Sequence, residues 1–472
     1  MADVKATDQL QGETGFRPDG LGLHAKVVGR AIMFFAVFAF FWLTTDPFVD
    51  LAVEDTLDPI IGANLVSQIL IVLLCALTLV AVRRTPLAVI RVLPSAALIM
   101  LIGWIGLSVI TAVYPDLALR RFVQAMIILV LAASLLLLPQ SGRQFNLWLA
   151  GATVAILVIS YLGVIVVPHR AIHQITEISE PQHAGSWRGP YMHKNVTGGA
   201  MGLIVVVGIH VARAVHRGLG VAIVVAAGLF LAMSQAKTSI GLMPVALAMT
   251  ALLLWLRSTP WRLLVIGGVL GGFNVLAVGS AVVPGLFQIV SMVTSDPTFT
   301  NRADVWRLVI TETLRRPLTG FGFQAFWGTD SVHYRNSLET WANKASHAHN
   351  AFLDIAVTIG IPGAILAIVW LVLLPILDLR RSELRGGSRT LDGLYMGIWT
   401  FTLLCATLEA TLFMTAGVGP MWFMMALAVF GLRLQARAHL VSEPDEEPVP
   451  RVRDLVASSE PGIEGPQSTS HR

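Results

Sequence analysis

The stretch AFLDIAVTIGIPGAILAIVWLVLLPIL, residues 351–377, decides the class of fold. Its 27 residues include a single charged side chain, Asp354. About 20 apolar residues in an α-helix are enough to cross the roughly 30 Å hydrocarbon core of a bilayer. The preceding segment, Pro284–Asn350, is polar and carries His347 and His349. A membrane-length helix that follows such a segment predicts chemistry at a membrane surface.

Composition extends this conclusion to the whole chain. Of the 472 residues, 55% are hydrophobic and only 13% are charged, and the mean hydropathy is +0.71. A soluble domain does not carry so much apolar surface. We therefore predict an all-α polytopic membrane protein with about 12 transmembrane helices, because that is the number of membrane-length apolar runs. The predicted spans are residues 28–45, 60–82, 93–113, 121–138, 146–167, 195–213, 218–233, 239–256, 263–283, 351–377, 393–414 and 417–434.

Arginine residues gather in alternate loops between these spans. If the N-terminus is cytoplasmic, the loops that contain Arg83, Arg143, Arg213, Arg257 and Arg380 all face the cytoplasm. Cytoplasmic loops of membrane proteins carry an excess of Lys and Arg, so this orientation satisfies the positive-inside rule loop by loop.

The same orientation divides the chain into three parts. Residues 1–27 and residues 435–472 are polar, and we predict that both are disordered cytoplasmic tails. The part between them, residues 28–434, is the predicted transmembrane domain. Its large outer loop, residues 284–350, comes before the tenth helix. Nearly every polar residue of interest falls on this outer side.

Several classes of function are disfavoured. The net charge of +4 is explained by membrane orientation, so nucleic acid is not an expected partner. Cys75 and Cys405 both lie inside apolar runs, where a thiol is usually a small hydrophobe. The sequence contains no P-loop, no metal-ligand spacing and no Gly-rich dinucleotide turn, so neither a cofactor nor a metal is expected.

Cations on the outer side run against the orientation bias and need their own explanation. Arg188, Lys194, Lys237 and Arg302 belong to this group. Arg offers planar, bidentate donors to phosphate and Lys a compact charge, so together they suit a diphosphate head group whose lipid tail stays in the bilayer. The alternative is that they bind phospholipid head groups or extend their charged ends to the interface.

Five short motifs, in this order, resemble the O-antigen ligase and Wzy-type polymerase superfamily. The resemblance covers roughly Arg188 to Gly363, and the order and spacing of the motifs are more specific than any one of them. The motifs are Trp187-Arg188-Gly-Pro-Tyr-Met-His193-Lys194-Asn195, Ser234-Gln-Ala-Lys237-Thr238-Ser239, Asn301-Arg302 with Trp306, Pro317-Leu-Thr-Gly-Phe-Gly-Phe, and His347-Ala-His349-Asn350 leading to Gly360-Ile-Pro-Gly363.

The resemblance implies a GT-C-like glycosyltransferase at the periplasmic face of the bacterial inner membrane. Its donor would be an oligosaccharide carried by undecaprenyl diphosphate in the membrane lipid, and its acceptor a glycan or a lipid. The motif that contains Lys237, where ligases often have Arg, favours polymerisation of repeat units into a surface or extracellular polysaccharide. The alternative is an O-antigen ligase that transfers glycan to the lipid A core. A flippase and a chain-length regulator are further expected partners.

The resemblance also implies roles for individual residues. His349 is the predicted catalytic residue, because a neutral imidazole can take the proton of an acceptor hydroxyl. Its alternative role is only to position the following helix. Arg302 is expected to bind the diphosphate, although Asn301 replaces the family's Gly. The remaining predicted substrate-binding residues are Arg188, His193, Asn195, Lys237, His347 and Asn350.

Some of these residues have purely structural alternatives. Asn195 and Asn350 precede predicted helices, where an Asn side chain often caps the first turn. His347 is either a substrate-orienting residue or a solvated loop histidine. Glu409 lies in a predicted helix interior, and an ionisable residue there is a functional candidate that can pair with an outer cation.

A transporter with about 12 helices is the alternative from another class, because many transporters share this helix count. Transporters are commonly built from paired repeats with broken, charged helices at the midplane. This chain shows no such repeat and concentrates its polar residues on the outer side. The sequence therefore favours the enzyme.

Overall fold

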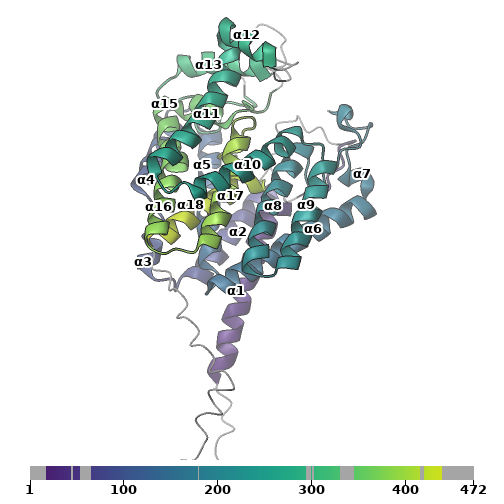
Figure 1. The fold of residues 1–472 in the computed structure, drawn as a ribbon, viewed down its shortest axis with the longest axis vertical. Helices are drawn as coiled ribbons and strands as arrows, with labels where there is room; N and C mark the ends of the chain where they lie inside the picture. Colours follow the sequence, from purple (N-terminus) through teal and green to yellow (C-terminus); the bar gives the residue numbers. More distant parts are fainter. Residues whose placement is uncertain are drawn as a thin grey trace, which may run out of the picture.

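The structure is a computed structural model of the 472-residue chain. It describes residues 18–43, 46–53, 65–178, 180–293, 299, 302–329, 345–414 and 419–437. Within these ranges the regular structure is helical and no strand is present; one isolated bridge pairs Ile172 with Trp187. The predicted all-α class is confirmed for the described residues (Figure 1).

The helices follow one another along the chain with short connections. Several begin at a residue whose side chain accepts from the first turn, as Ser95 and Ser141 do. The helices are α1 (Pro18–Leu43), α2 (Leu65–Val82), α3 (Leu87–Ile90), α4 (Ala96–Ile110), α5 (Pro115–Leu137), α6 (Gly142–Val166), α7 (Pro168–Ala171), α8 (Lys194–Ala214), α9 (Arg217–Met233), α10 (Lys237–Trp255), α11 (Thr259–Val282), α12 (Pro284–Val293), α13 (Arg302–Arg315), α15 (Ala351–Ile368), α16 (Leu374–Leu384), α17 (Arg389–Ala406) and α18 (Pro420–Arg437).

Each of the predicted spans overlaps at least one helix. Among the described residues, eight helical segments are long and apolar enough to cross a membrane, and the longest of them is Ala351–Leu384. Two shorter apolar helices, Ala96–Ile110 and Arg217–Met233, coincide with further predicted spans. The polytopic class is confirmed, and the count of about 12 spans stays a prediction.

The predicted cytoplasmic loops meet at one end of the helix bundle, the lower end in Figure 1. Arg262 at the start of α11 pairs with Glu383 at the end of α16. Arg433 near the end of α18 donates to the carbonyl oxygen of Val92 and pairs with Asp378. These buried and half-buried contacts join the ends of helices that are far apart in the sequence.

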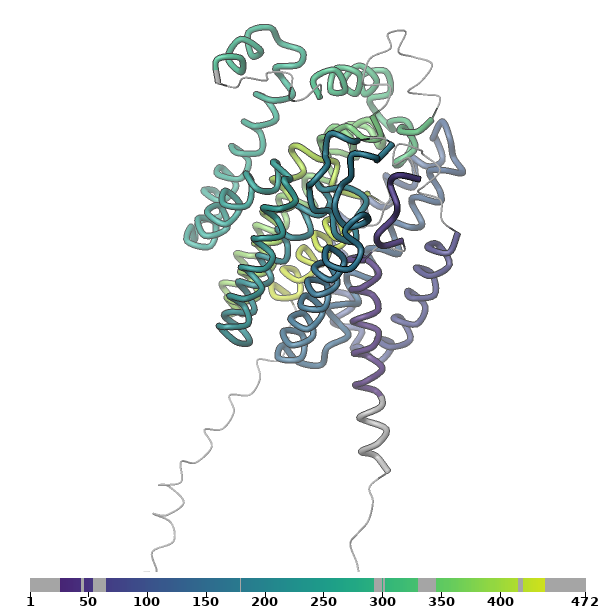
Figure 2. The backbone as a smooth tube through the Cα atoms, turned by 90° about the vertical axis from the view of Figure 1, so that its right-hand side faces the viewer, coloured from purple at the N-terminus to yellow at the C-terminus, as the bar shows by residue number. Residues whose placement is uncertain are grey.

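The predicted outer segments meet at the opposite end, which carries α12 and α13 (Figures 1 and 2). Phe48 N donates to Pro190 O, Trp187 N to Met233 O, and Val113 N to Phe321 O. Backbone bonds between these distant segments form a polar layer on the bundle.

Three boundaries differ from the sequence prediction. Helix α1 begins at Pro18, so the tail predicted for residues 1–27 is partly helical; residues 1–17 and 438–472 lie outside the described residues. Helices α12 and α13 lie within residues 284–350, which were predicted as a loop. Helix α17 ends at Ala406, so Glu409 lies in the turn after a helix instead of in its interior.

Helix α15 is broken at Gly360, whose φ of 74° no ordinary helical residue adopts. The break leaves the carbonyl oxygens of Val357 and Thr358 without helical partners. The segment after α13 supplies the donors: Phe321 N donates to Val357 O, and Gly322 N donates to Thr358 O. A Cβ at Gly360 would lie 1.9 Å from Leu318 O. The glycine therefore permits the close approach that fixes residues 317–322 to α15.

Candidate functional site

Glu409 is the centre of a polar cluster where four segments meet. Its Oε1 accepts from Arg302 Nη2 at 2.9 Å and from Asn195 Nδ2 at 3.3 Å. Its Oε2 lies 3.4 Å from His349 Nδ1. The pairing of Glu409 with a cation, left open by the sequence, is confirmed for Arg302, and the outer position of Arg302 stays a prediction. Residues 195, 302, 349 and 409 are thus brought together from the start of α8, the start of α13, the segment before α15 and the turn after α17.

Glu409 fixes the tautomer of His349. Burial alone would raise the pKa of the Glu409 carboxyl, but the contact with His349 and the charge of Arg302 outweigh it and hold the pKa well below the usual range. An ionised carboxylate only accepts hydrogen bonds, so the proton of a neutral His349 ring sits on Nδ1. Its Nε2 then carries the lone pair, which is the arrangement a general base needs.

His347 and His349 are packed together, with ring centroids 4.1 Å apart. His349 has a φ of 48°, in the left-handed region, which costs a non-glycine residue about 1–3 kcal/mol. Its N–H donates to His347 Nδ1 at 3.2 Å. Burial, and next the neighbouring His349, lower the pKa of His347 to about 3, so this ring is neutral near pH 7 and its proton lies on Nε2.

Asn350 caps α15. Its Oδ1 accepts from Phe352 N and Leu353 N, at 3.0 and 3.1 Å. Its Nδ2 donates to Asn274 Oδ1 at 2.7 Å and to Thr407 O at 3.0 Å. The capping alternative for Asn350 is therefore confirmed, and the same side chain ties α15 to α11 and to the end of α17.

A cavity of about 130 Å³ opens beside this cluster, between α8, α10, α17 and α18. Glu409 and His347 form part of its polar wall. Thr411 Oγ1 and Trp422 Nε1, from two of its lining residues, have no hydrogen-bond partner among the described residues. The complete lining is Asn195, Val196, Gly199, Thr238, Ser239, His347, Cys405, Glu409, Ala410, Thr411, Met414, Gly419, Met421 and Trp422.

Two lysines directly precede residues that line this cavity. Lys194 directly precedes the lining residue Asn195, and Lys237 directly precedes Thr238. Lys194 is close enough to Lys237 and to Glu180 for their charges to interact. Each lysine is the first residue of its helix, and at the start of α10, which has no side-chain cap, backbone N–H groups also favour an anion.

Arg188 lies apart from the cluster. It is fully buried, and its guanidinium donates to Tyr191 O at 3.0 Å and to Val49 O. Its carbonyl oxygen accepts from Thr197 Oγ1 at 2.6 Å. These bonds hold Val49 against the segment before α8, and the substrate contact of Arg188 stays a prediction.

His193 belongs to a second polar cluster, at the start of α8. Its Nδ1 accepts from Asn195 N at 3.0 Å, and its Nε2 lies 3.0 Å from Glu180 Oε2. Burial would raise the pKa of Glu180, but hydrogen bonds with His183 and His193 outweigh it and hold the pKa well below the usual range. Next to them, His173 Nε2 accepts from Lys194 N at 3.2 Å. Imidazoles therefore cap two successive N–H groups of α8.

Two sets of three side chains converge closely enough to be considered as metal ligands: Glu180 with His183 and His193, and His347 with His349 and Glu409. In both sets a backbone N–H already donates to the Nδ1 of one histidine, His193 or His347. A neutral ring then carries its proton on Nε2, so neither nitrogen has a lone pair free for a metal. The hydrogen bonds of His193 and His347 therefore disfavour metal binding by these two sets of side chains.

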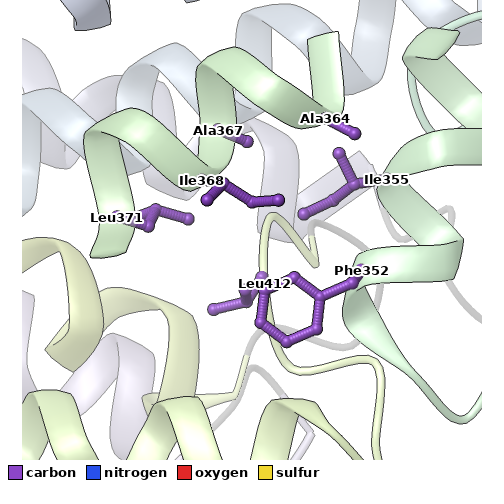
Figure 3. A pocket seen from close by; sticks show the side chains of 7 residues that line it. All are labelled: Phe352, Ile355, Ala364, Ala367, Ile368, Leu371 and Leu412. Atoms are coloured by element: carbon purple, nitrogen blue, oxygen red, sulfur yellow. The ribbon is translucent and has the colours of Figure 1, made fainter. Parts of the chain in front are cut away.

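A further, wholly apolar cavity lies between α15, the π-helical segment Val369–Leu373 and the turn after α17 (Figure 3). Side chains such as Phe352, Ile368 and Leu412 surround it (Figure 3). Its volume of about 10 Å³ is at the lower limit for a single water molecule. We assign no ligand to it.

The sequence identified most residues of the two polar clusters but not Asn274 and Glu180. Asn274 was overlooked although an Asn inside the apolar run of α11 is a polar group in hydrocarbon, which signals function or pairing. Glu180 carried no signal of its own, because nothing in the sequence places it beside His193. Asn301, part of the quoted motif, lies outside the described residues.

Fold and site together define a multi-pass membrane protein with a histidine–glutamate–arginine cluster at one end of its bundle. Residues 220–368 match the model of the family described as O-antigen ligase. This match confirms the resemblance to the O-antigen ligase and Wzy-type polymerase superfamily over the segment that carries Lys237, Arg302, His347, His349 and Asn350. Comparison with curated proteins gives no match.

Proposed function

We propose that this protein polymerises oligosaccharide repeat units linked to undecaprenyl diphosphate, at the periplasmic face of a bacterial inner membrane. The family match supports glycosyl transfer from a lipid-linked donor. The observation that carries the proposal is the pairing of His349 Nδ1 with Glu409. Glu409, which holds His349, and His347, its neighbour, both line the cavity at the end of the helix bundle.

The proposed reaction is direct transfer to an acceptor hydroxyl. His349 Nε2 takes the hydroxyl proton while the hydroxyl oxygen bonds to the anomeric carbon of the donor. The bond between that carbon and the diphosphate oxygen breaks, and the electron pair leaves with the lipid diphosphate. Glu409 stabilises the imidazolium that forms, as the carboxylate does in Ser-His-Asp triads.

Cations near the cavity suit the leaving group. Lys194 and Lys237, each next in sequence to a residue of the cavity wall, provide compact charges that suit a diphosphate at the level of the lipid head groups. Arg302 is held by Glu409 Oε1 and Leu408 O, so we assign it two roles: it keeps Glu409 ionised and adds positive charge near the leaving group. His193 takes a capping role and Asn195 orients Glu409.

The cavity itself is proposed to receive part of the substrate next to the reacting bond. Its volume resembles that of a cavity of about 150 Å³ that holds one benzene ring, so one sugar ring is of suitable size. The unpartnered Thr411 hydroxyl and Trp422 N–H offer hydrogen bonds that a sugar hydroxyl can use. His347 Nε2–H adds a further donor at the polar wall.

The alternative within the class is an O-antigen ligase, which the name of the matching family favours. Deletion of the gene separates the two. A polymerase deletion accumulates single repeat units on the carrier lipid, whereas a ligase deletion accumulates long carrier-linked chains. Single units support our proposal, and long chains would replace polymerase by ligase. A flippase that supplies the donor and a chain-length regulator remain proposed partners.

A further inference from the structure

Ala348, the residue between the two site histidines, is held through both of its backbone groups. Trp306 Nε1 on α13 donates to its carbonyl oxygen at 3.0 Å. Its own N–H donates to Asp354 Oδ1 on α15 at 3.1 Å. Ala348 is fully buried, so water does not compete for either bond. Side chains of two different helices thus fix the backbone that connects His347 and His349.

Asp354 is itself held in place. Trp327 Nε1 donates to the same Oδ1 at 2.6 Å, and Arg121 lies within electrostatic reach of the carboxylate. The side chains of Trp306, Trp327 and Asp354 are all at least nine-tenths buried. None of the three lines the cavity beside Glu409. They therefore act on the site through Ala348 and not by touching a substrate.

The conformation of His349 needs such support. A φ of 48° is one that L residues seldom adopt, and it persists where the surrounding structure over-determines it. The same conformation directs the N–H of His349 to His347 Nδ1 and its ring toward Glu409. If Ala348 were released, the histidine could relax to an ordinary backbone conformation and its ring would leave Glu409.

We infer that Trp306, Trp327 and Asp354 are positioning residues, which we call the Ala348 clamp. The clamp holds the backbone of residues 347–349 so that the His349 ring remains against Glu409. The inference rests on the proposed function only where turnover is measured. Whether the clamp fixes the backbone of residues 347–349 can be tested without any reaction.

The first test removes one hydrogen-bond donor and keeps an aromatic ring at the position. Trp306→Phe loses the bond to Ala348 O, and Trp399→Phe is the matched control, because Trp399 is equally buried and its Nε1 donates to Leu371 O away from the site. We measure amide hydrogen exchange of residues 345–350 in the full-length protein in lipid nanodiscs. Loss of the buried partner should accelerate exchange there about tenfold in Trp306→Phe and leave it unchanged in Trp399→Phe.

Turnover of lipid-linked donor in the same samples gives the second readout. Trp306→Phe should lower kcat by about 10- to 100-fold with little change in donor KM, because a misplaced base affects the transition state more than binding. Asp354→Asn, which keeps an Oδ1 acceptor for Ala348 and Trp327, should retain far more activity than Asp354→Leu.

The outcomes separate the clamp from the proposed function. Unchanged exchange at residues 345–350 in Trp306→Phe, or an equal loss of kcat in Trp399→Phe, would overturn the clamp. Equal loss in Asp354→Asn and Asp354→Leu would overturn the role of the accepted hydrogen bonds. Altered exchange in Trp306→Phe, together with a wild-type protein that transfers no glycan, would support the clamp and overturn the proposed function alone.

Discussion

Single residues show where sequence reasoning succeeds and where it stops. His349, Arg302 and Asn350 could be selected because they belong to short motifs with a recognisable order. Glu409 was visible only as an ionisable residue near an apolar run, and its partners lie 60 or more positions away in the chain. Such pairings depend on how helices pack, which a single sequence does not contain. The structure therefore changes Glu409 from an open question into the centre of the site.

Arg302 is the residue whose substitution best separates binding from chemistry. Arg302→Ala should weaken donor binding about 10- to 100-fold, because it removes positive charge and leaves Glu409 without its cation. Arg302→Lys should recover only part of this loss, since one ammonium group cannot contact both Glu409 Oε1 and Leu408 O in the same fork geometry. The measurement is titration of lipid-linked donor. An Arg302→Ala protein with unchanged affinity and turnover would remove Arg302 from the site.

Helix starts can be predicted from neighbouring residues, whereas helix breaks depend on residues that are distant in the sequence. The start of α15 at Asn350 could be predicted, because N-capping depends on neighbouring residues only. The break at Gly360 was not predicted, although Gly360-Ile-Pro-Gly363 was noted as a motif. Its carbonyl oxygens are satisfied by residues 317–322 and by Trp104 Nε1, which are distant in sequence. Helices α12 and α13 were not predicted, because the polar composition of residues 284–350 indicated a loop.

The first turn of α8 predicts a dependence of stability on pH. Burial lowers the pKa of His173 from 6.5 to about 4 in the folded protein, and the neutral ring accepts from Lys194 N. Because the unfolded chain binds this proton more readily, the contribution of His173 is complete above pH about 6.5 and is lost as the pH falls toward 4. The unfolding temperature should therefore decline between pH 6.5 and 4.5.

The matched measurement is the same pH series on His173→Gln. Glutamine does not titrate, so the decline should be shallower in the variant although its stability at pH 7.5 is lower. Parallel declines in the two proteins would show that other groups cause the acid sensitivity.

At the scale of the whole molecule, the arginine pattern and the structure agree on which segments share an end. Arg262 on α11 and Arg433 on α18 pair with residues of α16 at one end, whereas α12 and α13 lie at the opposite end (Figure 1). The pattern succeeds because it depends only on alternation along the chain. The number of spans is less accessible, since helices such as α17 and α18 are buried inside the bundle and carry charges of their own.

The predicted orientation is tested by cysteine labelling in intact spheroplasts, with Cys75 and Cys405 replaced by alanine. A cysteine at the exposed Ser346 should react with a membrane-impermeant maleimide, whereas one at the exposed Ser388 should react only after permeabilisation. The expectation follows from the positive-inside rule, which places the loop of Ser388 in the cytoplasm. The opposite pattern would reverse the orientation and place the site on the cytoplasmic face.

The central claim is that His349, held by Glu409, is the general base of glycosyl transfer. The direct measurement is turnover of lipid-linked repeat units by purified protein in nanodiscs, compared between wild type, His349→Ala and the control His169→Ala, whose side chain is exposed on α7. His349→Ala should remain folded and bind donor while its kcat falls by about 10²- to 10⁴-fold. The kcat of His169→Ala should match that of the wild type. The kcat of Glu409→Gln should fall, as that of His349→Ala does. A folded His349→Ala protein with wild-type turnover would contradict the account.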